Sequence, residues 1–247
     1  MKTLILILAL ACSANAGQMK AGDMGAVRVM HLNEGAGTAA YVEGSTYSTR
    51  ASVISGAWVD GLFGKSLSAA TVREDAFSFY MSTTSGAISF WFKAPKGTGV
   101  PSAIWLMFYI VDRPSGSGTA QLVFEHASGN WRTRIGSNNV NQYYRYISNP
   151  NAWYDGKWHL VVVNYGSKSD NKTWIDAKTA SGATGFSAGT AGMSVFNFCT
   201  SGGPAADCTS TYAPPYPVEE YVFWNKSLTQ GEQRRIYSEG LGRRHAR

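Results

Sequence analysis

The 247-residue sequence has few charged side chains and no concentrated charge of one sign. Charged residues make up 15% of the chain, and 22 basic against 16 acidic residues leave a formal net charge of +6. This small, scattered excess argues against a nucleic-acid partner, because phosphate-binding proteins gather Lys and Arg into a patch or stripe. The only basic cluster lies at the end of the chain: Arg243, Arg244, His245 and Arg247. We interpret residues 241–247 as a solvated tail, with contact to a nucleic acid or an anionic surface as the alternative.

Long apolar runs are missing after the N-terminus. Residues 4–11 form one short apolar run, preceded by Lys2 and followed by the small residues Ala14-Asn15-Ala16. This pattern predicts a cleaved signal peptide over residues 1–16, with a run too short to span a bilayer as a helix. We therefore expect a secreted or cell-surface protein that is not inserted in a membrane after cleavage. A lipoprotein carrying lipid on Cys12 is the alternative, although the residues before Cys12 match a lipidation box poorly.

Cysteine is also scarce, with three in the whole chain. Cleavage of the signal peptide would remove Cys12 and leave Cys199 and Cys208. An exported protein with an even pair of cysteines is expected to form a disulfide, which would contribute about 2–3 kcal/mol by closing a short loop. A metal-binding pair is the alternative, but no His or further Cys lies near enough in the sequence to complete a site.

Common catalytic motifs are absent from the sequence. It has no Gly-x-Ser-x-Gly elbow, no His-x-x-x-His spacing and no Gly-x-Gly-x-x-Gly loop. A glycoside hydrolase needs two carboxylates that approach the same bond, and on one strand they must alternate to share a face. The acidic pairs Glu74-Asp75 and Glu219-Glu220 are adjacent, so a strand would point their side chains to opposite faces. We predict that the protein is not an enzyme and has no catalytic cofactor.

Short apolar segments, separated by Gly- and Ser-rich turns, predict an all-β protein. One helix is expected near the end of the chain. Thr229-Gln230-Gly231-Glu232 has the form of a capping box, which would start the helix, and Gly240 is expected to end it. Many strands with one small helix indicate a β-sandwich. The expected strands cover residues 27–32, 88–93, 103–111, 121–126, 131–135, 158–165, 172–176 and 221–224.

Period-two alternation assigns faces within two of these strands. In 131–135 both arginines, Arg132 and Arg134, lie on the face opposite Trp131. In 158–165 we expect Trp158, Leu160 and Val162 to point into the sandwich, and Val161 and Val163 to point away. From the neighbouring strand either Trp174 or Ile175 would pack against the inward face, and alternation alone does not say which.

Several blocks resemble, in order and spacing, the LamG-like jelly rolls of the concanavalin A-like lectin/glucanase superfamily. The motifs that carry the resemblance are an Asn-Glu-Gly-x-Gly-Thr turn, an Ile-Ser-Phe-Trp-Phe-Lys strand, a Gly-x-Trp-His hairpin, and a closing strand followed by a helix start. Ala177 departs from the pattern, because a turn Gly is usual there. The blocks cover 29–38, 58–67, 87–93, 155–165 with 172–176, and 218–229. The resemblance implies a two-sheet antiparallel jelly-roll sandwich over 27–240, after a lead-in at 17–26, with one short C-terminal helix.

Together with the signal peptide and the missing carboxylate pair, the resemblance favours an exported, non-catalytic recognition module that binds a carbohydrate, a glycoprotein or a surface polymer. Sugar-binding surfaces use exposed rings against the apolar faces of pyranoses, with polar side chains beside them. Two ring-rich polar segments supply the candidate ligand-binding residues Tyr143, Tyr144, Arg145, Tyr146 and Trp153. Packing of these rings at the sandwich edge is the alternative.

Two further points follow from the resemblance. Many relatives hold a structural Ca²⁺ at the sandwich rim, and Glu43, Glu219 and backbone carbonyls are the candidate ligands here. The alternative functions are a structural surface or virion component that uses the jelly roll for assembly, and, less favoured, a glycoside hydrolase. The fold by itself does not separate these functions.

Overall fold

The computed structural model describes residues 23–44, 50–74, 85–97, 105–112, 120–127, 130–137, 141–147, 150–166, 172–179, 196–199 and 215–242. The predicted signal peptide 1–16, Cys208 of the predicted disulfide and tail residues 243–247 lie outside these ranges. The strands are β1 (Ala26–Met30), β2 (Ala39–Glu43), β3 (Arg50–Asp60), β4 (Lys65–Glu74), β5 (Gly86–Lys93), β6 (Trp105–Asp112), β7 (Ala120–Ala127), β8 (Asn130–Ser137), β9 (Asn141–Tyr146), β10 (Trp158–Tyr165), β11 (Lys172–Ile175), β12 (Lys178–Thr179), β13 (Phe196–Cys199) and β14 (Val218–Trp224). The helices are η1 (Asp23–Gly25), η3 (Pro150–Trp153) and the C-terminal α1 (Gln230–Gly242).

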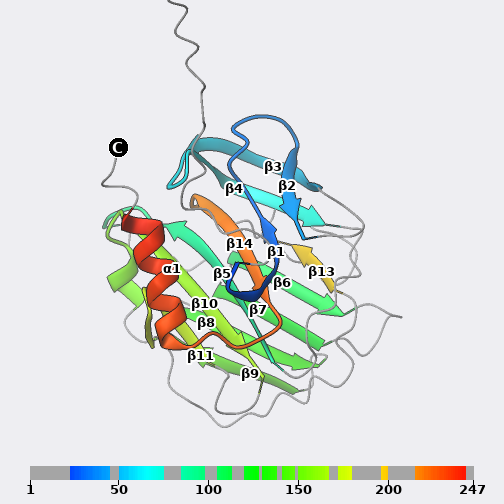
Figure 1. The fold of residues 1–247 in the computed structure, drawn as a ribbon, viewed down its shortest axis with the longest axis vertical. Helices are drawn as coiled ribbons and strands as arrows, with labels where there is room; N and C mark the ends of the chain where they lie inside the picture. Colours follow the sequence, from blue (N-terminus) through cyan, green and yellow to red (C-terminus); the bar gives the residue numbers. More distant parts are fainter. Residues whose placement is uncertain are drawn as a thin grey trace, which may run out of the picture.

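The strands form one continuous antiparallel ladder that folds into two layers (Figure 1). Its order is β12-β11-β10-β5-β14-β1-β2-β3-β4-β13-β6-β7-β8-β9. We call β12, β11, β10, β5, β14 and β1 the first layer, and β13, β6, β7, β8 and β9 the second layer. The long strands β3 and β4 pair with two shifts of register, and such bulges let a sheet bend between layers. The expected antiparallel jelly-roll sandwich with one C-terminal helix is confirmed.

The main hydrophobic core lies between the two layers. Aromatic side chains of the first layer contact those of the second: Phe90 lies 5.6 Å from Phe124 and Phe92 lies 5.8 Å from Trp131, measured between ring centroids. The buried Tyr221 hydroxyl donates a 2.6 Å hydrogen bond to the Met107 carbonyl. This bond satisfies a polar group that would otherwise be costly to bury and ties β14 to β6 across the core.

A second core fills the space between the outer face of the first layer and α1. It contains Trp91, Trp158 and Trp224 from the strands and Ile236 from the helix. Strand β10 is consequently buried on both faces. The expectation that Trp158, Leu160 and Val162 point between the sheets is therefore wrong.

The residues of β10 that face the other layer are Val161 and Val163, and Ile175 lies beside them. Trp174 is partly buried on the helix side, next to Val162. Alternation correctly divided β10 into two sets, but both sets are apolar. The sequence pattern therefore could not say which set would face α1.

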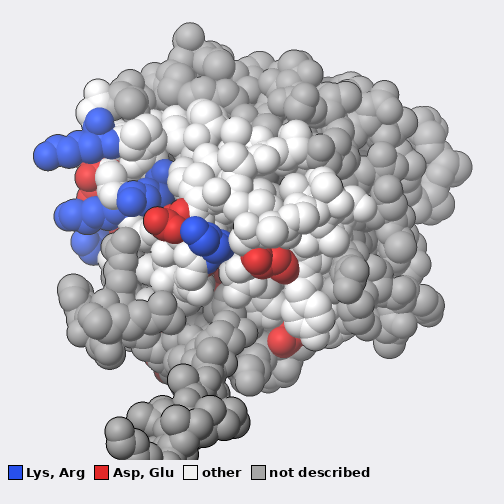
Figure 2. Space-filling model, turned by 90° about the horizontal axis from the view of Figure 1, so that it is seen from above, with Lys and Arg blue, Asp and Glu red and all other residues white. Residues whose placement is uncertain are grey.

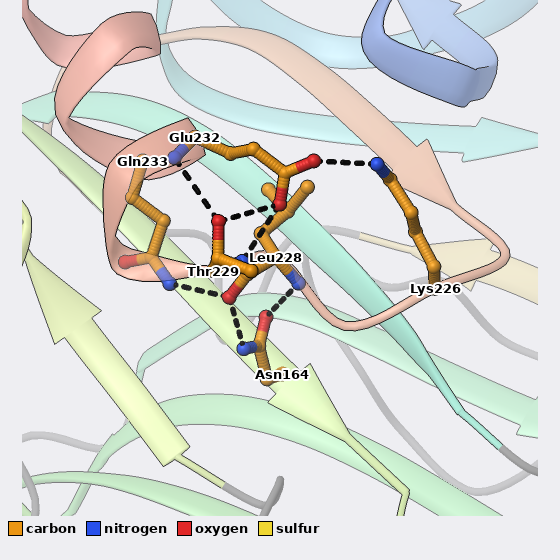
Figure 3. Close-up of polar contacts among 6 residues, drawn as sticks. All are labelled: Asn164, Lys226, Leu228, Thr229, Glu232 and Gln233. Carbon is orange, nitrogen blue, oxygen red and sulfur yellow. Dashed lines mark hydrogen bonds and ion pairs between the residues drawn. The ribbon is translucent and has the colours of Figure 1, made fainter.

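The start of α1 is fixed by side chains that bond to backbone (Figure 3). The Thr229 amide donates to the Glu232 carboxylate at 2.8 Å, and the Glu232 amide donates to the Thr229 hydroxyl at 3.3 Å, which confirms the capping box. The buried Asn164 amide group donates to the Leu228 carbonyl at 2.8 Å and accepts from the Leu228 amide at 3.2 Å. Gln233 also donates to the Leu228 carbonyl. The Asn164 side chain thus pairs with the backbone of Leu228 as a neighbouring strand would, and it links β10 to the start of α1.

The helix continues through Gly240 to Gly242, so the predicted stop at Gly240 is wrong. Gly240 instead lets α1 approach the first layer closely. A β-carbon at this position would lie 2.4 Å from the ring of the buried Trp91, whereas one at Gly231 would meet nothing closer than 3.9 Å. We expect Gly240→Ala to destabilise the protein by about 1–3 kcal/mol, despite the better helix propensity of Ala, because Trp91 is a rigid ring in a packed core. Urea unfolding measures the change.

Gly231→Ala is the matched control for that variant. It makes the same substitution in the same helix, at a position where the added β-carbon meets no close neighbour. It should be neutral or stabilising by up to about 1 kcal/mol. Equal destabilisation by both substitutions would contradict close packing of α1 on Trp91.

Trp158 is the large buried side chain of β10 beneath α1. Trp158→Ala should cost about 3–5 kcal/mol, because deleting a buried aromatic ring leaves a cavity. Thermal melting of the purified variant tests this. A wild-type melting temperature would show that the ring is not buried as described.

Candidate functional site

The predicted ligand-binding residues do not share one surface. Four of them lie on β9, the end strand of the second layer, and Trp153 lies in η3. Arg145 is buried and its backbone pairs with the core residue Thr133, whereas the Tyr146 ring is 53% exposed. The side chains of Tyr143 and Tyr144 lie outside the described part of the structure.

Trp153 packs at the sandwich edge. Its ring is partly buried against the core between the layers and stands edge-on to His159, with 5.5 Å between the centroids. This location fits the packing role that sequence reasoning left as the alternative. Among the predicted rings whose side chains the structure describes, Tyr146 is the one exposed to solvent.

Tyr146 belongs to a row of three side chains across the outer face of the second layer. Glu125 of β7 pairs with Arg132 of β8, and Arg132 pairs with Tyr146 of β9, each directly opposite the next. Directly opposite residues in antiparallel strands have β-carbons about 5 Å apart on the same face. We call Glu125, Arg132 and Tyr146 the outer row.

Alternation with core residues fixes the outward direction of this row. Phe124, Trp131 and Ile147 are buried between the layers, and each precedes or follows a member of the outer row in the chain. The face assignment for Arg132 made from the sequence is therefore confirmed. Its alignment with Tyr146 was missed, because cross-strand register depends on turns that the sequence pattern does not specify.

The outer row combines an exposed ring with an oriented guanidinium. Arg132 Nε donates to Glu125 Oε1 at 2.8 Å, and the two side chains are 19% and 5% exposed. Burial of the Glu125 carboxylate is tolerated because the arginine compensates its charge. The register between β8 and β9 places Arg132 directly opposite Tyr146 on the other side. A pyranose could stack on the ring while its hydroxyl oxygens accept from a guanidinium beside it.

A second polar cluster centres on the buried His159. Its Nδ1 lies 2.8 Å from Asp176 Oδ2 and its Nε2 lies 3.0 Å from Asp155 Oδ1. A neutral imidazole has one N–H, so two ionised carboxylates at both nitrogens favour the doubly protonated ring. Burial acts to lower the pKa of His159, but the hydrogen bonds and charges of Asp176 and Asp155 outweigh it and raise the pKa. Because carboxylates occupy both ring nitrogens, His159 is poorly placed as a general base or metal ligand.

The two candidate calcium ligands have other contacts. Glu219 accepts from the Leu62 amide at 2.6 Å and from the Phe63 amide at 2.9 Å, so both carboxylate oxygens face N–H donors. Glu43 lies 3.4 Å from His31 Nε2. Across the described ranges, no three His, Cys, Asp or Glu side chains gather as a metal site would require. These residues do not fit the expected calcium site, and we derive no role for a metal from them.

Charge on the visible surface is mixed rather than of one sign. Figure 2 shows Lys and Arg side chains gathered on the side where α1 lies in Figure 1, with acidic side chains among them. On α1 itself, Arg235 bonds to Glu239 at 2.7 Å. Among the described residues no helix is both long and apolar enough to cross a membrane.

Comparisons with known proteins relate the chain to others through its fold. No protein-family model and no curated protein sequence matches it. A Trypanosoma rangeli sialidase in complex with sialic acid matches with a TM-score of 0.56 and 12% identity, over 91% of this chain and 36% of its own. The binding domain of Paraclostridial Mosquitocidal Protein 1 matches with a TM-score of 0.58 and 10% identity, over 87% of this chain and 52% of its own.

The receptor binding domain of botulinum neurotoxin mosaic serotype C/D matches with a TM-score of 0.54 and 13% identity, over 87% of this chain and 50% of its own. The chain thus spans about a third of the sialidase and about half of each toxin domain. These likenesses show a shared β-sandwich fold. They leave the catalytic status of this chain open, since enzymes and binding domains both occur among them.

The raised pKa of His159 predicts that stability depends on pH. The contribution of His159 is complete below its ordinary pKa of 6.5 and is lost as the pH rises through the higher folded-state value. Urea unfolding between pH 5.5 and 8.5 should therefore show wild type losing its advantage over His159→Gln as the pH increases. The test compares the free energy of unfolding of wild type with that of His159→Gln at each pH. Burial lowers the pKa of His31 in both proteins, which makes stability rise with pH, and this effect cancels in the difference.

Proposed function

We propose that the protein is an exported, non-catalytic recognition module that binds glycans on the outer face of its second layer. The observation that carries this proposal is the outer row, in which the exposed Tyr146 lies directly opposite Arg132, an arginine paired with a buried carboxylate on its other side. Carbohydrate sites need this combination, because a sugar ring has an apolar face and polar edges. The fold shared with a sialic acid-bound sialidase and with toxin binding domains supports the proposal.

The predicted sequence features support export of such a module. A signal peptide over 1–16 and a disulfide between Cys199 and Cys208 would suit an extracellular protein. Mass spectrometry of the exported protein tests both: an N-terminus at Gly17 and a mass two hydrogens below the reduced form are expected.

A glycan array probed with wild type, Tyr146→Ala and Tyr146→Phe tests the binding role of the outer row. Tyr146→Ala should lower the affinity for the bound glycans at least about tenfold, which corresponds to about 1.4 kcal/mol. Tyr146→Phe keeps the stacking surface and should stay within about threefold of wild type. Because Tyr146 is half exposed, both variants should melt within a few degrees of wild type.

Two results would contradict the proposal. Wild type that binds no glycan on the array would remove the function itself. Glycan binding that Tyr146→Ala leaves unchanged would place the site elsewhere on the molecule.

A further inference from the structure

Tyr41 is the second large apolar side chain that the described part of the structure exposes, at 47%. It lies on β2 between Ala40 and Val42, which are both buried in the core between the layers. Alternation therefore directs the Tyr41 ring outward, as it does for Tyr146 on β9. Tyr41 and Tyr146 are thus both half-exposed rings on the outside of the sandwich.

The ring of the buried His31 packs against the Tyr41 ring. The buried His31 ring stacks on it, with 5.8 Å between centroids and 9° between the planes. The His31 amide donates to the Tyr41 carbonyl at 2.9 Å, which fixes the two backbones relative to each other. An exposed aromatic ring supported in this way loses little side-chain entropy when a ligand stacks on it.

Near each exposed tyrosine lies a carboxylate paired to a basic side chain, and in the outer row it is the basic side chain, Arg132, that lies opposite the tyrosine. Glu43 lies 3.4 Å from His31 Nε2 and its side chain is 27% exposed, so its oxygens can accept from sugar hydroxyls. In the outer row the corresponding pair is Glu125 with Arg132. Both places therefore combine a stacking ring with an oriented polar pair.

The two places are too far apart to form one site. In the ladder six strands separate β2 from β9, namely β3, β4, β13, β6, β7 and β8. Figure 1 shows β2 near the upper end of the long axis and β9 near the lower end. A single pyranose ring cannot contact both tyrosines.

We propose that Tyr41, His31 and Glu43 form a second glycan-binding site, so that one chain carries two sites and cross-links polyvalent glycans. This inference rests on the proposed function of the outer row. The expected ligand is a sugar whose apolar face stacks on Tyr41 and whose hydroxyls donate to Glu43. Two linked sites raise the apparent affinity for a polyvalent surface without any new contact.

The test mixes the protein with a sialylated mucin, and with the same mucin after removal of sialic acid. Size-exclusion chromatography first selects monomer, so that cross-linking cannot come from a protein dimer. Light scattering over a range of protein-to-mucin ratios should rise and then fall, as bivalent cross-linking requires. Binding to the immobilised mucin is measured in parallel.

Tyr41→Ala and Tyr146→Ala should each retain binding but lose the scattering peak. Each should also lower the apparent affinity for immobilised mucin about 10- to 100-fold, because one site then acts alone. Tyr41→Phe is the control that keeps the ring, and it should scatter like wild type. Thermal melts of all variants exclude unfolding as the cause.

The outcomes separate this inference from the function on which it rests. If wild type binds mucin, but Tyr41→Ala binds and scatters like wild type, the second site is refuted and the outer row stands. If wild type binds neither mucin, the proposed function fails and the second site fails with it. Loss of all binding by a folded Tyr41→Ala would also overturn the inference, since the outer row should still bind.

Discussion

The fold depends on burying both faces of the central strands of the first layer. Strands β10 and β14 are buried along their whole length, and β5 is buried except at its last residue. A sheet with two apolar faces needs two covers. The second layer covers one face, and α1 covers the other over Trp91, Trp158 and Trp224. Detachment of α1 would expose those rings, which is why its entry is anchored by Asn164 and the capping box.

The way in which the two faces of the first layer are covered limits where a ligand can bind. The helix occupies the outer face of the first layer, and its close approach at Gly240 leaves no space for a ligand between α1 and Trp91. The second layer buries its inner face against the first, while the described part of its outer face presents Tyr146 and Arg132. One layer therefore serves mainly stability, and the other offers an exposed ring and a charged partner to a ligand.

Local patterns in the sequence predicted part of this structure well. The strands that became β1, β5, β10 and β14 were found because their apolar residues alternate or follow one another, and the helix because its cap is local. Strands β2, β3, β4, β9 and β13 were missed, since Gly, Ser, Ala or polar residues interrupt their apolar pattern. Ala177, noted as a departure from a usual Gly, adopts the left-handed conformation with a φ of 58°. The outer row was not predictable, because it depends on the register between three strands.

Hydrogen exchange with and without the sialylated mucin tests the central claim most directly, because it locates the contact on the folded protein. If the outer row binds glycan, amides of β8 and β9 should exchange more slowly in the presence of mucin. Amides of α1 and β10 should be unchanged, since the helix already covers that face of the first layer. Protection confined to α1, with β8 and β9 unaffected, would contradict the account and move recognition to the helix side.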